Sequence, residues 1–173
     1  EVNIVGENAL RENELNSIKF PNTISSIENR ALRQNNISSV IIPNSVTNLG
    51  ELSFYDNKIS EIIIPDSITN IEGGVFTKNQ LSEDDAYIYD RKEDGSIDKT
   101  RFMSYGGTKT KDVSLPEGIV TIGASAFWTI GMEEVDIPDS VINIEQYAYA
   151  DNKLTEVVIP DNVETIGEYA FHS

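Results

Sequence analysis

The stretch from Leu154 to Phe171, LTEVVIPDNVETIGEYAF, contains the pattern that decides the fold. Its proline is the last of six along the chain: Pro21, Pro43, Pro65, Pro116, Pro138 and Pro160. Successive prolines are 22, 22, 51, 22 and 22 residues apart. A fixed period of about 20–50 residues is typical of stacked repeat architectures. Because one unit is too small to enclose a core, we predict a single solenoid over residues 1–173.

Each unit contains two segments of different character. Before the proline, β-branched residues alternate with others, as Val157 and Ile159 do before Pro160, which indicates a short strand. Strands that recur once per coil in the same direction pair in parallel. Residues 167–171 contain better helix formers at spacings of three and four, which predicts a helical or 3₁₀ turn on the opposite side. The predicted fold class is therefore α/β.

Asparagine recurs in a separate column that Ile130 interrupts: Asn13, Asn35, Asn57, Asn79 and Asn152. An amide side chain both donates and accepts, so stacked copies can satisfy backbone groups at the bend of each coil. A simple preference of asparagine for turns is compatible with the same pattern. Because the spacing follows the repeat, we expect a structural role for this column rather than a ligand-binding one.

The unit L-x-x-V-x-I-P-x-x-V-x-x-I-G-x-x-A-F-x-x-N resembles the BspA-type leucine-rich repeat of bacterial surface proteins and some protozoan ones. The match is close along the opening stretch, at Leu154, Pro160, Val163, Ile166, Gly167, Ala170 and Phe171. This resemblance implies a leucine-rich-repeat solenoid with a parallel sheet on one face and short helical or 3₁₀ turns on the other. It also implies an extracellular or cell-wall-attached bacterial protein that acts as an adhesin-like binding module.

The interval between Pro65 and Pro116 is the one departure from the repeat, at 51 residues where other intervals take 22. The excess lies at about 82–109 and contains AYIYDR and TRFMSY, joined by a polar stretch with Asp94-Gly95. Asp-Gly between runs of strand formers signals a tight hairpin turn. We predict an inserted β-hairpin that protrudes from the solenoid. Insertions in repeat arrays often lie on the binding face, so it is a candidate for recognition.

The inserted segment is rich in acidic residues, namely Glu83, Asp84, Asp85, Asp90, Glu93, Asp94 and Asp98. A calcium loop places oxygen ligands at alternate positions and closes with a distant glutamate. The stretch D-R-K-E-D-G-S-I-D keeps neither spacing and interposes Arg91 and Lys92. Solvated hairpin charge is therefore the preferred interpretation, and no metal or other cofactor is expected.

Composition excludes several functional classes. The formal net charge of −16 argues against nucleic acid, because such proteins place Lys and Arg against phosphates. There is no cysteine, which removes disulfides and thiol chemistry. No stretch approaches the roughly 18 apolar residues of a membrane span. The one imidazole, His172, is expected to face solvent without a catalytic role, and we predict that the chain is not an enzyme.

Strand alternation directs two columns outward onto the exposed sheet face. The candidate partner-binding residues in these columns are Lys19, Ile41, Ile63, Asp136 and Val158 in one, and Glu61, Glu134 and Glu156 in the other. Neighbouring Ile41 and Ile63 form an apolar pair on a face that solvent should otherwise cover, unless they serve strand propensity alone or lie under the hairpin. Trp128 is a further candidate anchor, although packing against the adjoining coil is the preferred interpretation.

The leading functional hypothesis is a non-enzymatic protein-binding module that uses the exposed sheet face and the hairpin. Its expected partner is a host or envelope protein that offers basic groups around an apolar centre, without nucleic acid and without membrane insertion. The alternative is a rigid spacer or stalk segment with no ligand, whose acidity serves solubility. Carbohydrate binding would require exposed aromatic platforms, and the outward strand columns contain none.

Overall fold

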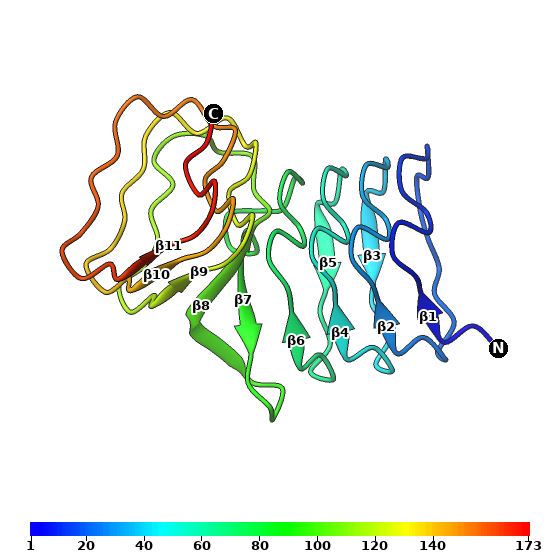
Figure 1. Ribbon diagram of the computed structural model, residues 1–173. Coiled ribbons are helices and arrows are strands. Elements are labelled where there is room, and N and C mark those ends of the chain that lie inside the picture. Colours follow the sequence, from blue (N-terminus) through cyan, green and yellow to red (C-terminus); the bar gives the residue numbers. More distant parts are fainter.

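The computed structural model describes residues 1–173, and Figure 1 shows the chain winding through successive coils stacked in a row. Every regular element is a strand. There is no helix, and so none that would be long and apolar enough to cross a membrane. The strands have these bounds: β1 Ile4–Val5, β2 Ser26–Ile27, β3 Ser39–Ile41, β4 Asn48–Leu49, β5 Glu61–Ile63, β6 Asn70–Ile71, β7 Tyr87–Arg91, β8 Ile97–Tyr105, β9 Thr121–Ile122, β10 Asn143–Ile144 and β11 Thr165–Ile166.

The most regular sheets are formed by short strands, all of which except β1 follow a proline. β1, β2, β4 and β6 make one parallel sheet, in which Ile27 pairs with Leu49 and Leu49 with Ile71. β9, β10 and β11 repeat this arrangement in the C-terminal coils, and Figure 1 shows both sets along one edge of the molecule. Partners lie one repeat apart, because 22 residues return the chain to the same point of the next coil.

The strand predicted before each proline forms in only part of the chain. β3 and β5 pair in parallel, and one further parallel bridge joins Ser114 to Asp136. In the C-terminal coils the outward positions carry Glu134 and Glu156, and like charges on neighbouring strands oppose pairing. The strand predicted before the proline is therefore present in part of the chain, and the continuous feature of each half is the strand after the proline.

The expected helical or 3₁₀ turns are absent, so that part of the fold-class prediction is wrong. In each coil the segment after the second strand contains residues in the left-handed region, such as Arg30 at φ 58° and Tyr147 at φ 56°. A left-handed residue interrupts right-handed winding. It also turns its N–H toward the next coil, where Arg30 N donates to the carbonyl of Glu51 at 2.8 Å. These bonds between coils replace the bonds within a helix.

The asparagine column forms a ladder of buried hydrogen bonds. The Asn57 Oδ1 accepts from the Ile37 N–H at 3.1 Å, and its Nδ2 donates to the carbonyls of Leu32 and Phe54 at 3.0 and 3.1 Å. Asn35, Asn79 and Asn152 make the same three kinds of contact. Each amide thus joins its own coil to the preceding one, as expected from the sequence.

The buried side chains form two groups that meet at β8. Met103 packs with the apolar residues of the first three coils, whereas Phe102 packs with those of the last three. In the second group the rings stack from coil to coil, with centroids 5.0 Å apart for Phe102 and Phe127 and 4.9 Å apart for Phe127 and Tyr149. Successive side chains of a strand point to opposite sides, so β8 is a wall shared by both groups.

β7 and β8 form an antiparallel pair within the segment predicted for the hairpin, with irregular register around Tyr89. The turn between them reaches beyond the neighbouring strands in Figure 1. It nevertheless lies against the third coil, because a Cβ on Gly95, at φ +81°, would be 2.3 Å from the Asp66 carbonyl oxygen. β8 also continues as a parallel partner of β9, with Arg101 opposite Thr121. The hairpin is thus partly a coil of the solenoid rather than a free protrusion.

The asparagine ladder predicts an unequal response to truncation within one column. Asn57→Ala leaves the buried Ile37 N–H without a partner, while the Leu32 and Phe54 carbonyls each keep a second bond, from Asn35 and Asn79. The change should lower the free energy of unfolding by about 2 kcal/mol. Asn13 is exposed and bonds only to the carbonyls of Leu10 and Arg11 in its own coil. Asn13→Ala should therefore cost less than about 1 kcal/mol. Urea denaturation followed by circular dichroism measures both, and equal losses would contradict a role in joining coils.

Candidate binding surfaces

The first candidate surface is the outer face of β3 and β5. Ile41 and Ile63 lie opposite each other and are 71% and 63% exposed. Val40, which precedes Ile41 in β3 and points to the opposite side of the strand, is 3% exposed. Glu61 is also exposed and shares this face with Ile63, two residues along the strand. Ser39 lies opposite Glu61 in the register. The face is therefore an exposed apolar pair bordered by a carboxylate and a hydroxyl.

The other predicted column residues do not join this pair. Lys19 is exposed just before Pro21, outside any strand. Glu134, Asp136, Glu156 and Val158 are all exposed beyond the inserted segment, so the structure divides the predicted surface in two. The C-terminal part contains a shallow pocket of about 310 Å³, lined in part by Glu134 and Asp136. The C-terminal part of the predicted surface is acidic, and Val158 is the one exposed apolar side chain among its predicted residues.

Trp128 lies on a different side of the coils. Its ring stacks on Tyr55 at 5.2 Å between centroids, and its Nε1 donates to the Asp151 carboxylate at 2.8 Å. The Arg33 guanidinium lies 5.0 Å from the Tyr55 ring and 5.2 Å from the Trp128 ring. Thr77, the residue between Tyr55 and Trp128 in this column, is small and buried, which leaves room for the two rings to meet. These contacts link the coils on either side of the insertion.

Two surface tyrosines beside Trp128 were missed by the sequence reasoning, which considered only the strand columns. Tyr147 and Tyr169 are exposed and stack on each other, with centroids 5.2 Å apart and planes at 12°. Each ring covers one face of the other, and His172 packs edge-on against Tyr169 with centroids 5.6 Å apart.

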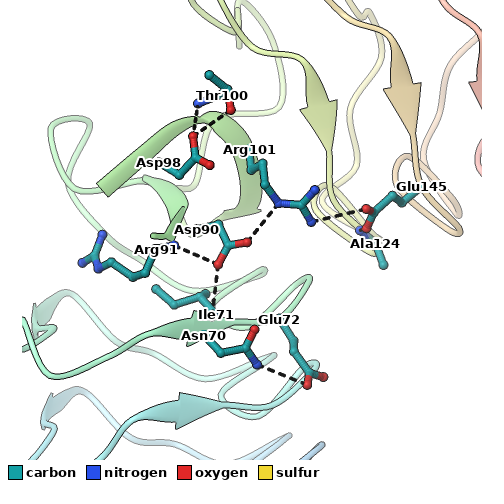
Figure 2. A network of polar contacts seen from close by, with 10 residues as sticks. All are labelled: Asn70, Ile71, Glu72, Asp90, Arg91, Asp98, Thr100, Arg101, Ala124 and Glu145. Atoms are coloured by element: carbon teal, nitrogen blue, oxygen red, sulfur yellow. Dashed lines mark hydrogen bonds and ion pairs between the residues drawn. The ribbon is translucent and has the colours of Figure 1, made fainter. Parts of the chain in front are cut away.

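A polar network joins the two halves of the molecule beside β7 and β8 (Figure 2). The Asp90 carboxylate accepts from the Arg101 Nε at 3.0 Å and from the Ile71 N–H of β6 at 3.4 Å. Arg101 reaches onward to the Glu145 carboxylate at 3.6 Å, and Glu145 accepts from the Ala124 N–H at 3.0 Å. The sequence offers one sign of it, since Arg101 is the one charged residue in a column otherwise held by Ile, Ser, Asn and Thr.

The network borders a cleft of about 290 Å³ between the two halves, with further lining from Glu51, Glu72 and Gln146. Burial raises the pKa of Glu51, an effect that Arg30 opposes and the carboxylate of Glu72 reinforces. On the hairpin, hydrogen bonds from Ser96 lower the pKa of Asp94. No cluster of three or more acidic or imidazole side chains is arranged to hold a metal ion.

The stacked parallel coils, the asparagine ladder and the outward strand columns define a leucine-rich-repeat solenoid. The chain belongs to the BspA type leucine-rich repeat family, whose model matches six copies over residues 1–86 and 95–173. The unmatched residues, 87–94, comprise β7 and the start of the turn that follows it. No curated protein sequence matches the chain.

The fold is similar to that of a leucine-rich repeat protein from Eubacterium ventriosum, with a TM-score of 0.67 and 21% sequence identity. The similarity covers 95% of this chain and 53% of that protein. The chain thus spans about half the length of the protein that it resembles, and at this identity the likeness concerns the fold.

The junction between the halves predicts a strong effect of one added methyl group. A Cβ on Gly73 would lie 2.0 Å from the carbonyl oxygen of Ala124, a backbone atom that cannot move aside alone. Gly73→Ala should therefore lower the free energy of unfolding by about 2–3 kcal/mol. Gly6→Ala is the matched control, because nothing lies within 4 Å of a Cβ there. Thermal unfolding that shifts equally in both variants would contradict close packing at the junction.

The raised pKa of Glu51 predicts that replacing its carboxylate with a neutral side chain stabilises the fold in a pH-dependent way. The folded state favours the protonated form, so the ionised carboxylate destabilises the fold above its folded pKa. Glu51→Gln should raise the stability at neutral pH by less than about 1 kcal/mol. The gain should fall as the pH drops through the folded pKa and vanish only below the lower pKa of the unfolded chain. Glu7 lies 3.8 Å from the same Arg30 but is exposed, and Glu7→Gln should show no such gain in urea titrations across this range.

Proposed function

We propose that this chain is a non-enzymatic, adhesin-like protein-binding module of a secreted or cell-surface bacterial protein. The observation that carries the proposal is the pair of exposed isoleucines, Ile41 and Ile63, in register on β3 and β5. Exposed apolar patches rimmed by polar groups mark interaction sites more often than other surfaces. Membership of the BspA type repeat family, whose repeats occur in bacterial surface proteins, supports a location at the cell surface.

The charge of the chain supports a partner with basic groups around an apolar centre. The formal net charge is −16, and Glu61 stands on the same face as Ile63. Complementary charge increases the rate of encounter and the specificity of an interface. Glu134 and Glu156 extend the acidic character beyond the insertion. The same charge disfavours nucleic acid as a partner.

The candidate acid–base groups support a binding role rather than catalysis. His172 is exposed and packs edge-on against Tyr169, with centroids 5.6 Å apart. In the network of Figure 2, Asp90 and Glu145 accept hydrogen bonds from Arg101 or backbone amides. These bonds join the two halves of the molecule, which supports a structural use of both carboxylates.

The rival proposal is a rigid spacer, which the regular coils on both sides of the insertion favour. A spacer has no need of an apolar pair at one place on its surface. The column of Ile41 and Ile63 carries Lys19, Ser114 and Asp136 in other coils, so the pair is not a general requirement of the repeat. This local difference is why we prefer recognition to a purely mechanical role.

A pair of double variants tests the proposed surface. Ile41→Asp/Ile63→Asp places two charges at the centre of the patch and should weaken capture of purified host matrix or envelope proteins at least about tenfold. Ile4→Asp/Ile166→Asp is the control, since these isoleucines are 53% and 50% exposed near the two ends of the array. Biolayer interferometry of wild type and both variants gives the dissociation constants.

Circular dichroism and the urea midpoint confirm that both variants remain folded. Equal binding by all three proteins would remove the assignment of the patch. Wild-type protein that binds nothing in a panel of matrix and envelope proteins would favour the spacer instead.

A further inference from the structure

The position for a third strand beside β5 is vacant. β3 and β5 are contributed by successive coils, and the residues at the same point of the next coil are 83–85. They form a turn instead, in which the Asp85 N–H donates to the Ser82 carbonyl at 3.1 Å and the Ser82 hydroxyl donates to the Asp85 carboxylate at 2.9 Å. The sheet therefore ends at β5, which pairs with β3 alone.

The free edge of β5 has unpaired backbone groups. Ser60 N donates to the Ser38 carbonyl of the preceding coil at 3.0 Å, while the Ile59 carbonyl accepts from Gln80 N of the next coil at 2.9 Å. Backbone groups along a strand point alternately to the two sides. Those of Glu61 and Ile63 consequently point away from β3, toward the vacant position. A long unprotected edge of this kind is a template for pairing with another chain.

A pocket of about 210 Å³ with a mixed apolar and charged lining lies at this edge. Half-buried Ile62 of β5 and Ile64, the residue after the strand, line it together with Tyr89 of β7 and Ile97 of β8. The pocket is thus the place where the side chains of a following coil would otherwise continue the core.

The charges around the pocket are mostly negative. Glu61, Asp84 and Asp85 are exposed, and none of the three takes part in an ion pair. Arg91 is the one cation in the lining. Burial lowers the pKa of Arg91, while the nearby carboxylates of Asp66 and Asp90 oppose that effect. The exposed carboxylates are therefore free of ion pairs, and Arg91 is the one cation that a docked segment would meet in the pocket.

We propose that β5 is a docking edge for an extended segment of a protein partner, which adds a third strand to the sheet. Its alternate residues are apolar and enter the pocket, and the residues between them are lysine or arginine and face the carboxylates. This is strand addition, in which main-chain bonds give affinity and side-chain pockets give specificity. The inference deepens the proposed function and rests on it. Pairing of β5 with a second copy is opposed by like charge at Glu61.

A designed peptide provides the test. The probe is a labelled peptide of about eight residues in which lysine alternates with valine and isoleucine, a length that matches ordinary strands. Fluorescence anisotropy should show binding that weakens between about 50 and 500 mM NaCl. In NMR hydrogen exchange, the peptide should protect the amides of Glu61 and Ile63. The same peptide with glutamate in place of lysine should bind at least about tenfold more weakly.

Two further probes test the strand geometry directly. Each is N-methylated on alternate residues, one probe in each phase, which removes backbone donors while keeping every side chain. One of the two should lose at least about tenfold in affinity, because only one phase faces β5. On the protein, Ile97→Asp should weaken binding of the peptide at least about tenfold, whereas Ile166→Asp should leave the affinity unchanged. These two isoleucines are 49% and 50% exposed, so neither change should disturb folding.

Equal binding of all the peptides, or binding without protection of Glu61 and Ile63, would overturn the inference. Dimerisation of the chain in sedimentation, abolished by Ile97→Asp, would assign the edge to a second copy instead and also overturn it. Partner capture that depends on Ile41 and Ile63 while no peptide binds β5 would leave the proposed function standing and the docking edge refuted. If neither partner capture through Ile41 and Ile63 nor peptide binding at β5 is found, both the proposed function and the docking edge are refuted.

Discussion

The side-chain amides of the asparagine column are the interaction on which the solenoid depends. Each of Asn35, Asn57, Asn79 and Asn152 is buried and satisfies one N–H and carbonyls of two coils. Aspartate cannot donate and serine cannot reach both coils, so no other small residue replaces all three bonds. Because each amide fixes the register of one coil on the next, the apolar columns meet residue for residue, and the strands after each proline pair without slippage.

The inserted hairpin is best understood as a joint between two short solenoids. β8 supplies Met103 to one buried group and Phe102 to the other, and Arg101 of the same strand anchors the network of Figure 2. On another side of the coils, Tyr55 and Trp128 stack across the same boundary. These three contacts hold the halves together at different points around the coil, so the insertion stiffens the array that it interrupts.

The same interruption creates the surface features that suggest recognition. A regular coil would have placed a further strand beside β5, as β5 itself lies beside β3, and would have covered Ile62 and Ile64. The chain instead turns at residues 83–85 and leaves a free edge, a partly apolar pocket and three unpaired carboxylates in one place. The exposed pair Ile41 and Ile63 lies on the adjoining face. Recognition in this protein is therefore proposed where the repeat fails, since the regular part of the array offers mostly solvated polar columns.

The sequence by itself determined the solenoid, its 22-residue register, the structural use of asparagine and the place of the hairpin, because all of these follow from periodicity. It did not determine the backbone of 167–171 and its equivalents. Local propensity favours a helical turn there, but hydrogen bonds between neighbouring coils stabilise left-handed residues instead, and such bonds exist only once coils have stacked. The Tyr55–Trp128 stack and the Asp90–Arg101–Glu145 network were likewise decided by tertiary structure. They join residues on both sides of an irregular insertion, where no repeat relates one partner to the other.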